Sequence, residues 1–313
     1  KSFLLELLKD RLLVDMLLCP LMYYGSSYEN DMDLSQFAIM FRAIYLEGMF
    51  RPEGTIKNFL DMLVDHYLAL GGSLKKSCGV EKIIHHKGKA VGVVLESGEE
   101  IECDYLLSTI GRDETMLLLG NSPEASAHAQ RLGFVETIYQ VPEDTAAIAC
   151  DKTIIFYNTG DRFRYQNPDE FVDFSSGVIC FPGNFQGLAA KDLQEIRSTH
   201  LANYAMWKQL SQNAERYQAQ KKAASHRSSQ CLENIIGSFT ANIVYENSFT
   251  PVTIERYTGK IDGAIYGNPI KTKNGDIGFA NLFLAGTDQG FLGIVGSMLS
   301  GVSIVNQQIL PKL

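Results

Sequence analysis

The 313-residue sequence lacks the features of several large classes of protein. It has no basic stretch with interleaved aromatic residues, and its formal net charge of −8 argues against nucleic-acid binding. Its six cysteines lie far apart and include no C-x-x-C pair, so neither a zinc site nor a dithiol redox motif is indicated. We interpret the cysteines as reduced thiols and predict no metal site.

The leucine-rich N-terminal segment, residues 3–24, has no uninterrupted apolar run. Charged residues break it well before the roughly 20 apolar residues that a membrane span needs; they are Glu6, Lys9, Asp10, Arg11 and Asp15. A secretory signal, with its apolar core and small-residue cleavage site, is also absent. We therefore expect an amphipathic helix that Pro20 stops, and a cytoplasmic protein, with peripheral membrane contact left open.

The composition that is present, 45% hydrophobic and 20% charged, is typical of folded globular proteins, and the length allows two domains. The most informative stretch is residues 281–308. A short apolar strand, residues 282–285, passes through a glycine-containing turn into an apolar helix that begins near Gly293. Free N–H groups and the positive dipole end of such a helix favour an anionic or electron-rich ring.

Small residues of this helix fall on one face, and larger apolar residues fall on another. The small ones are Gly293, Gly296, Ser297, Ser300 and Gly301. This pattern predicts a buried helix pressed against something flat. Close packing on a sheet, with no ligand, explains the pattern equally well.

The run 284–288, LAGTD, followed by glycines and by Ser300 and Gly301, resembles the C-terminal flavin-contacting segment of the FAD-dependent amine oxidase and phytoene desaturase superfamily. The resemblance implies that Asp288, or else Thr287, bonds the flavin ribitol. It also implies that the strand end and the helix N-terminus contact the cofactor, through Gly286, Gly293, Ile294, Val295 and Gly296. In many relatives the acid directly follows the glycine, whereas here it comes one residue later.

A second matching stretch is a helix, residues 56–70, that Gly71 and Gly72 end, followed by strand-like runs at residues 79–85, 90–96 and 100–108. The turns between them predict a β-meander. In the same superfamily such a segment returns the chain to the FAD domain. The resemblance implies that Val80 meets the adenine end through its backbone and that Gly111 lies near the cofactor; alternatively, Val80 is simply a strand residue.

The middle of the chain is less informative. Residues 145–157 and 172–181 look like strands, and residues 189–222 look like one or two polar helices. Residues 249–267 are similar to a Thr-Pro, aromatic and glycine-containing run of phytoene desaturases and carotenoid isomerases. That similarity implies a crossing strand with a close glycine approach, and it makes Tyr266 a candidate to border the substrate cavity or else a packing residue.

These observations predict an α/β fold, α+β overall, with a partial Rossmann-like FAD-binding domain and a substrate domain of antiparallel sheet and helices. The expected parts are substrate-domain helices (1–50), an FAD-domain segment (51–112), the substrate domain (113–255) and a C-terminal FAD-domain segment (256–313). The G-x-G-x-x-G turn that holds the FAD pyrophosphate is absent from the sequence. We therefore expect this chain alone to bind FAD weakly or not at all, and a separate N-terminal dinucleotide-binding unit to be a partner.

The resemblance implies an FAD-dependent oxidoreductase of the desaturase, saturase or isomerase type, present as a C-terminal portion and acting on an apolar polyene or lipid-like substrate. One alternative is a non-catalytic substrate-binding module or a split-enzyme subunit. Another is a flavin amine oxidase, which would need an aromatic cage and usually a lysine near the flavin. No residue is assigned a catalytic role.

Overall fold

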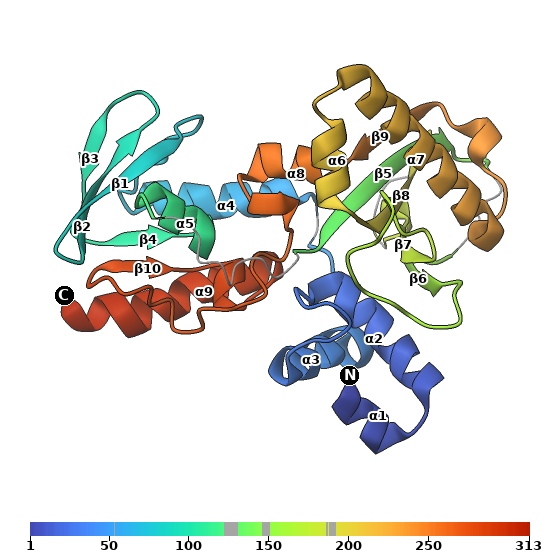
Figure 1. Cartoon of the computed structure of the whole chain (residues 1–313), viewed down its shortest axis with the longest axis horizontal. Helices are drawn as coiled ribbons and strands as arrows, with labels where there is room; N and C mark the ends of the chain where they lie inside the picture. Colours follow the sequence, from blue (N-terminus) through green and yellow to red (C-terminus); the bar gives the residue numbers. More distant parts are fainter. Residues whose placement is uncertain (53, 122–130, 146–150, 186, 188–191) are drawn as a thin grey trace.

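The computed structural model describes residues 1–52, 54–121, 131–145, 151–185, 187 and 192–313. The fold is α/β. Figure 1 shows two groups of elements side by side, one with a parallel strand pair and a β-meander and the other with a larger antiparallel sheet, and three N-terminal helices below.

The parallel pair joins two segments that are far apart in the sequence. Strand β4 (Leu106–Ser108) lies beside β10 (Leu282–Leu284) with the two chains running in the same direction. All three residues of β10 are buried, whereas those of β4 are only half-buried. A central strand of a parallel sheet is normally covered on both faces, so β10 is covered as a central strand would be, whereas β4 is not.

The predicted meander is confirmed, with one change at its end. Strands β1 (Val80–His86), β2 (Lys89–Leu95) and β3 (Glu100–Glu102) form an antiparallel sheet in that order. The third predicted run is not one strand, because its last part leaves the meander and becomes β4. Ile83 and Ala90 on the inner face of the meander pack against Leu282.

The five-stranded sheet has the order β6-β7-β8-β5-β9 and is antiparallel. Its strands are β5 (Gly133–Pro142), β6 (Ile154–Asn158), β7 (Ser176–Cys180), β8 (Leu193–Ala202) and β9 (Tyr245–Phe249). The prediction of one or two helices over residues 189–222 was wrong for residues 193–202, which form β8, and is confirmed for the later part, which is helical; residues 189–191 lie outside the described residues. Ile196, Ser198 and His200 of β8 alternate onto one buried face, and a serine and a histidine there hid the strand pattern.

Helices α6 (Tyr204–Leu210) and α7 (Ala214–Ile236) follow β8. Helix α7 packs on the sheet through small polar residues: the Tyr139 hydroxyl donates to the Ser225 carbonyl at 2.7 Å, and the hydroxyls of Ser198 and Ser228 lie 2.8 Å apart. A hydrophobic core that contains Met22 and Phe134 lies between the sheet and the N-terminal helices.

The N-terminal segment forms two helices, α1 (Ser2–Leu8) and α2 (Arg11–Gly25), so the prediction of one helix stopped by Pro20 was wrong. The break comes at Lys9, which has a φ of +54°, and the Asp10 side chain then caps α2 by accepting from the Leu13 N–H at 3.0 Å. Pro20 lies inside α2. The Tyr45 hydroxyl donates to the carbonyl of Met16, the group that Pro20 leaves without its helical donor.

Helix α3 (Leu34–Phe41) continues into a π-helical turn, Arg42–Glu47. Helix α4 (Ile56–Ala69) has the predicted bounds within a residue, but none of its residues is buried. Where a crossing strand was predicted, the chain instead forms α8 (Pro251–Thr258), because Thr250 caps a helix whose first residue is proline. None of the helices in the described ranges is long and apolar enough to cross a membrane.

Candidate functional site

The carboxyl ends of β4 and β10 lie side by side, and most of the predicted site residues follow directly from them. The Ala285 N–H donates to the Ser108 carbonyl at 2.9 Å, which keeps the two chains together just beyond the strands. A Cβ on Gly286, which has a φ of +88°, would lie 3.7 Å from the Thr109 carbonyl oxygen. Ligands of open α/β sheets bind at this end of the strands.

Gly111 follows β4 and precedes α5 (Arg112–Leu118). Its φ is +122°, and a Cβ there would overlap the Glu114 carboxylate and lie 2.7 Å from the Lys260 Nζ. The position therefore requires glycine. The two residues before it, Thr109 and Ile110, are exposed, whereas Gly111 itself is buried. The chain beyond β4 therefore lies at the protein surface just before Gly111.

The turn after β10 is held from within. The Gly286 N–H donates to the Ser300 hydroxyl at 2.6 Å, and that hydroxyl donates to the Gln289 side chain. Ser300 belongs to α9 (Gly293–Ile304), so one buried hydroxyl joins the strand end, the turn and the helix. This explains one of the small residues that the sequence places on the helix face.

Helix α9 begins at Gly293 as predicted, and the expectation that it is buried was wrong. Within α9 only Ser300 and Ile304 are buried; the exposed fraction is 65% for Val295 and 57% for Val302. The helix contacts the parallel pair through Ile304, which packs on Phe283. Apart from its chain neighbours and the helix's own backbone, no described atom lies within 4 Å of a Cβ placed on Gly293, so the surface at this residue is open; a Cβ on Gly296 would instead lie 3.2 Å from the Phe291 backbone.

A buried group of charges lies beneath Gly111, where the chain passes between the two groups of elements. Arg131, just before β5, donates to Asp113 and lies 3.6 Å from the Glu114 carboxylate. The Lys260 Nζ is buried with no hydrogen bond in the described part of the chain. Burial raises the pKa of Glu114, and the neighbouring Lys260 opposes that shift.

Lys271 and Asp288 complete this group. Burial lowers the pKa of Lys271 to about 8, the nearby Asp288 carboxylate opposes the shift, and the Lys271 Nζ donates to the Tyr266 carbonyl at 2.6 Å. Asp288 is 1% exposed. No sequence pattern marked Arg131, Lys260 or Lys271, because their charged partners are distant in the chain.

The remaining predicted residues lie elsewhere in the fold. The Tyr266 hydroxyl donates to the Tyr23 carbonyl, and its ring meets the Phe134 ring edge-on at 5.9 Å between centroids. Tyr266 thus packs in the core between α2 and the five-stranded sheet. Val80 is the first residue of β1, where it pairs with Leu95.

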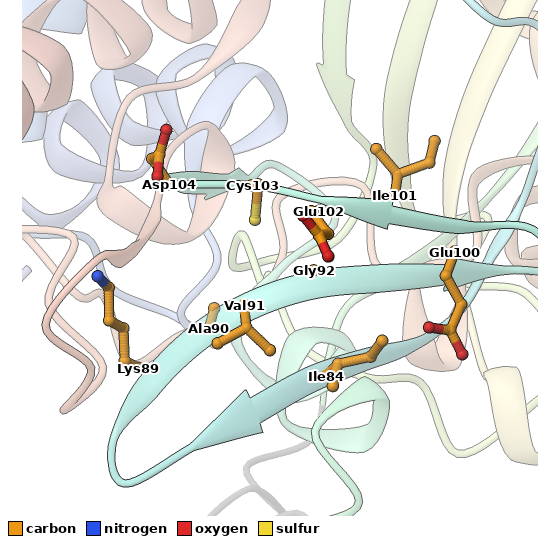
Figure 2. A pocket seen from close by; sticks show the side chains of 10 residues that line it. All are labelled: Ile84, Lys89, Ala90, Val91, Gly92, Glu100, Ile101, Glu102, Cys103 and Asp104. Carbon is orange, nitrogen blue, oxygen red and sulfur yellow. The ribbon is translucent and has the colours of Figure 1, made fainter.

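A surface cavity of about 500 Å³ lies on the meander rather than at the strand ends. Figure 2 shows its lining side chains on β1, β2 and β3 and just beyond β3, with three carboxylates among them: Glu100, Glu102 and Asp104. None of the predicted site residues lines it. The described residues contain no group of three or more side chains arranged to hold a metal ion.

No family model matches the sequence, and no curated protein matches it. Among solved structures, the chain is similar to an oxidoreductase from Methanosarcina mazei, with a TM-score of 0.54 and 15% identity over 82% of this chain and 55% of the other. Over the matched part, the two chains share a fold. The chain therefore spans about half the length of this similar protein.

Two further solved structures are less similar. They are a Pyrococcus furiosus protein (13% identity, 81% of this chain and 52% of the other, TM-score 0.45) and a tryptophan halogenase from Shewanella frigidimarina (13%, 82% and 39%, TM-score 0.39).

Proposed function

We propose that the chain is the C-terminal portion of an FAD-dependent oxidoreductase of the desaturase, saturase or isomerase type, acting on an apolar polyene or lipid-like substrate. The observation that carries this proposal is that Gly111 and Gly286 both follow the carboxyl ends of a parallel strand pair. The α/β fold shared with an oxidoreductase supports it. The polyene class comes from the resemblance of residues 249–267 and 284–301 to phytoene desaturases and carotenoid isomerases.

The residues at the strand ends fit a flavin dinucleotide. Gly286 has a positive φ and only the Thr109 carbonyl oxygen near a Cβ placed on it, so its backbone could approach a ligand closely, and the open surface at Gly293 leaves room for a flat ring. The flavin would supply the hydride or electron exchange. Residues 109–112, 286–287 and 293–296 would bind and orient it, and the apolar side chains of α9 would exclude water.

A dinucleotide-binding unit is the partner that this arrangement needs. The far edge of β10 is already taken, because the Leu284 N–H donates to the Gly275 carbonyl at 2.8 Å and Asp276 pairs with Phe283. The far edge of β4 has no strand partner in the described ranges. Parallel strands occur in larger sheets covered on both faces, so we expect a further strand at β4 and a cover over α4 and α9.

The unburied α4 and α9 also favour a second candidate, a split-enzyme subunit or a non-catalytic module that binds an apolar ligand. Reconstitution separates the candidates. The chain is purified alone and joined to a dinucleotide-binding unit, and flavin absorbance is measured for both.

We expect little flavin on the chain alone and a yellow, stoichiometrically loaded protein when the two are joined. A colourless joined protein that is folded and monomeric would contradict the flavoenzyme and favour the module. Stoichiometric flavin on the chain alone would contradict the need for a partner.

A further inference from the structure

The two groups of elements in this fold have separate hydrophobic cores. We call residues 80–121 and 276–313 the meander group, and residues 1–47 with the described part of residues 131–258 the sheet group (Figure 1). Within the described ranges, every hydrophobic cluster of buried residues belongs to one group: those with Ile83 and Phe283 to the meander group, and those with Phe134, Tyr139 and Trp207 to the sheet group. The packing of these cores therefore does not fix the orientation of one group relative to the other.

Buried polar side chains join the two groups instead. Arg131, which precedes β5 of the sheet group, is 5% exposed and donates to the Asp113 carboxylate on α5 of the meander group. Its guanidinium also lies 3.6 Å from the Glu114 carboxylate and donates to the Ile261 carbonyl at 3.3 Å. Glu114 in turn accepts from the Ile261 N–H at 2.9 Å. The side chains of α5 thus hold both the chain that enters β5 and the chain that returns after α8.

The returning connection, residues 259–268, is held at its far end and open at its near end. Asp113 accepts from the Asn268 side chain at 2.8 Å, and Asp288 accepts from the Asn268 N–H at 2.9 Å. Gly259 has a φ of +68°, and apart from its chain neighbours no described atom lies within 4 Å of a Cβ placed on it. A few loop residues that can change φ and ψ are sufficient for a hinge. Gly259 is placed to be such a residue.

The contacts between the groups away from this junction are more exposed. Lys273 and Asp33 form an ion pair at 3.5 Å, but the Lys273 side chain is 73% exposed. The Leu292 side chain would lie 3.3 Å from a Cβ placed on Gly25. Exposed ion pairs contribute little to stability, and domains without a large apolar interface normally move relative to each other. The buried contacts of Arg131 are therefore the ones placed to restrain that motion.

We infer that the two groups are hinged at the connection after α8, and that the contacts of Arg131 with Asp113, Glu114 and Ile261 are the lock that holds them in one orientation. Arg131 is thus a positioning residue. It determines where the five-stranded sheet stands relative to the carboxyl ends of β4 and β10. The lock is made by side chains and backbone of this chain alone, so it holds whether or not a flavin binds.

The test measures the distance between two spin labels on the full chain, one in each group. The labels are attached through unnatural amino acids at Ser97 and Gln212, which are both exposed, so that the native cysteines stay unlabelled. We expect double electron–electron resonance to give one narrow distance distribution for the wild type. Arg131→Met should broaden this distribution about twofold, because the groups then move as loosely joined domains do. Hydrogen exchange in β1 and β5 should stay as slow as in the wild type.

A second variant keeps the test decisive if Arg131→Met unfolds the protein by leaving two buried carboxylates without a counter-charge. Arg131→Met combined with Asp113→Asn and Glu114→Gln removes all three charges and keeps side chains of similar size. It should broaden the distribution to the same extent. Arg197→Met is the matched control, because Arg197 pairs with two glutamates inside the sheet group, and its loss should leave the distribution unchanged.

The lock is contradicted if the charge-free variant is folded and keeps the wild-type distribution, or if Arg197→Met broadens the distribution as much. A broad distribution in the wild type would also overturn it, because nothing would then hold one orientation. Loss of slow exchange in both β1 and β5 of the charge-free variant would overturn it too, since the junction would then be part of a single cooperative core.

Discussion

The side chain of Asn281 makes both backbone hydrogen bonds of Ala90, accepting from its N–H at 2.8 Å and donating to its carbonyl at 2.7 Å. The same Nδ2 group donates to the Asp104 carbonyl at 2.6 Å. One buried amide therefore connects the start of β10 to the meander and to the chain entering β4. This contact sets the position of β10, and with it that of the turn at Gly286.

We expect Asn281→Ala to lower the free energy of unfolding by about 2–3 kcal/mol, because the two buried backbone groups of Ala90 and the partly buried Asp104 carbonyl lose their partner. Asn281→Asp keeps the acceptor for the Ala90 N–H and loses both donors, so it should also be less stable than wild type. Urea unfolding at neutral pH measures both. A loss below about 0.5 kcal/mol for Asn281→Ala would show that water replaces these hydrogen bonds.

Gly293 and Gly98 form a matched pair for testing the flavin-facing terminus. Both have positive φ, +72° and +83°, and neither has an atom within 4 Å of a Cβ placed on it. Alanine should strain both backbones alike, by about 1 kcal/mol. Only Gly293→Ala should reduce FAD binding in the reconstituted protein, because its methyl group fills the open face of α9. Equal FAD affinities of the two variants, measured by fluorescence titration, would remove Gly293 from the site.

His200 makes the free energy of unfolding depend on pH. It is fully buried, its Nε2 lies 2.7 Å from the Tyr157 hydroxyl, and burial lowers its pKa from 6.5 to about 3. The folded state keeps the ring neutral while the unfolded state gains a proton below pH 6.5. Stability is therefore complete above pH 6.5 and is lost as pH falls towards 3.

Between pH 7 and pH 5 this single residue should remove about 2 kcal/mol of unfolding free energy. His200→Gln keeps a hydrogen-bond acceptor for Tyr157 but does not titrate. Between pH 7 and pH 5 the unfolding free energy of this variant should therefore fall by about 2 kcal/mol less than that of wild type. Parallel pH profiles of wild type and variant would argue against a neutral buried ring.

The exposed apolar face of α9 should cause the isolated chain to self-associate. Replacing Val295 and Val302 by lysine should shift its elution from size-exclusion chromatography towards the monomer, since both side chains are more than half exposed. Val244→Lys, at an apolar position with an exposed fraction of 59%, is the control and should change nothing. The α9 variant should also assemble poorly with a dinucleotide-binding unit. A monomeric wild-type chain would contradict this explanation.

The sequence predicts the elements that local rules define. The meander and the strand-turn-helix segment ending in α9 have alternating or glycine-marked patterns, and the structure has both. Strand β8 was missed because polar residues, Ser198 and His200, occupy its buried face under α7. The burial of α9 was wrongly predicted because small residues indicate close packing without saying which part of the protein provides the cover.

The site was predictable in part. Gly111 and Gly286 follow the ends of β4 and β10, which pair as parallel strands, and their contact with a flavin stays a prediction. The burial of the Asp288 side chain could not be predicted from the sequence. Its carboxylate accepts hydrogen bonds from the Arg112 and Asn268 backbone N–H groups, and these residues are distant in the chain. The roles of Val80 and Tyr266 in binding stay predictions.

The central claim is that the carboxyl ends of β4 and β10 and the start of α9 hold a flavin. The most direct measurement is hydrogen exchange of the chain assembled with a dinucleotide-binding unit, with and without FAD. We predict that FAD slows exchange in residues 109–112, 286–287 and 293–296. Protection confined to the meander cavity of Figure 2 or to the five-stranded sheet, with those three segments unchanged, would contradict the claim.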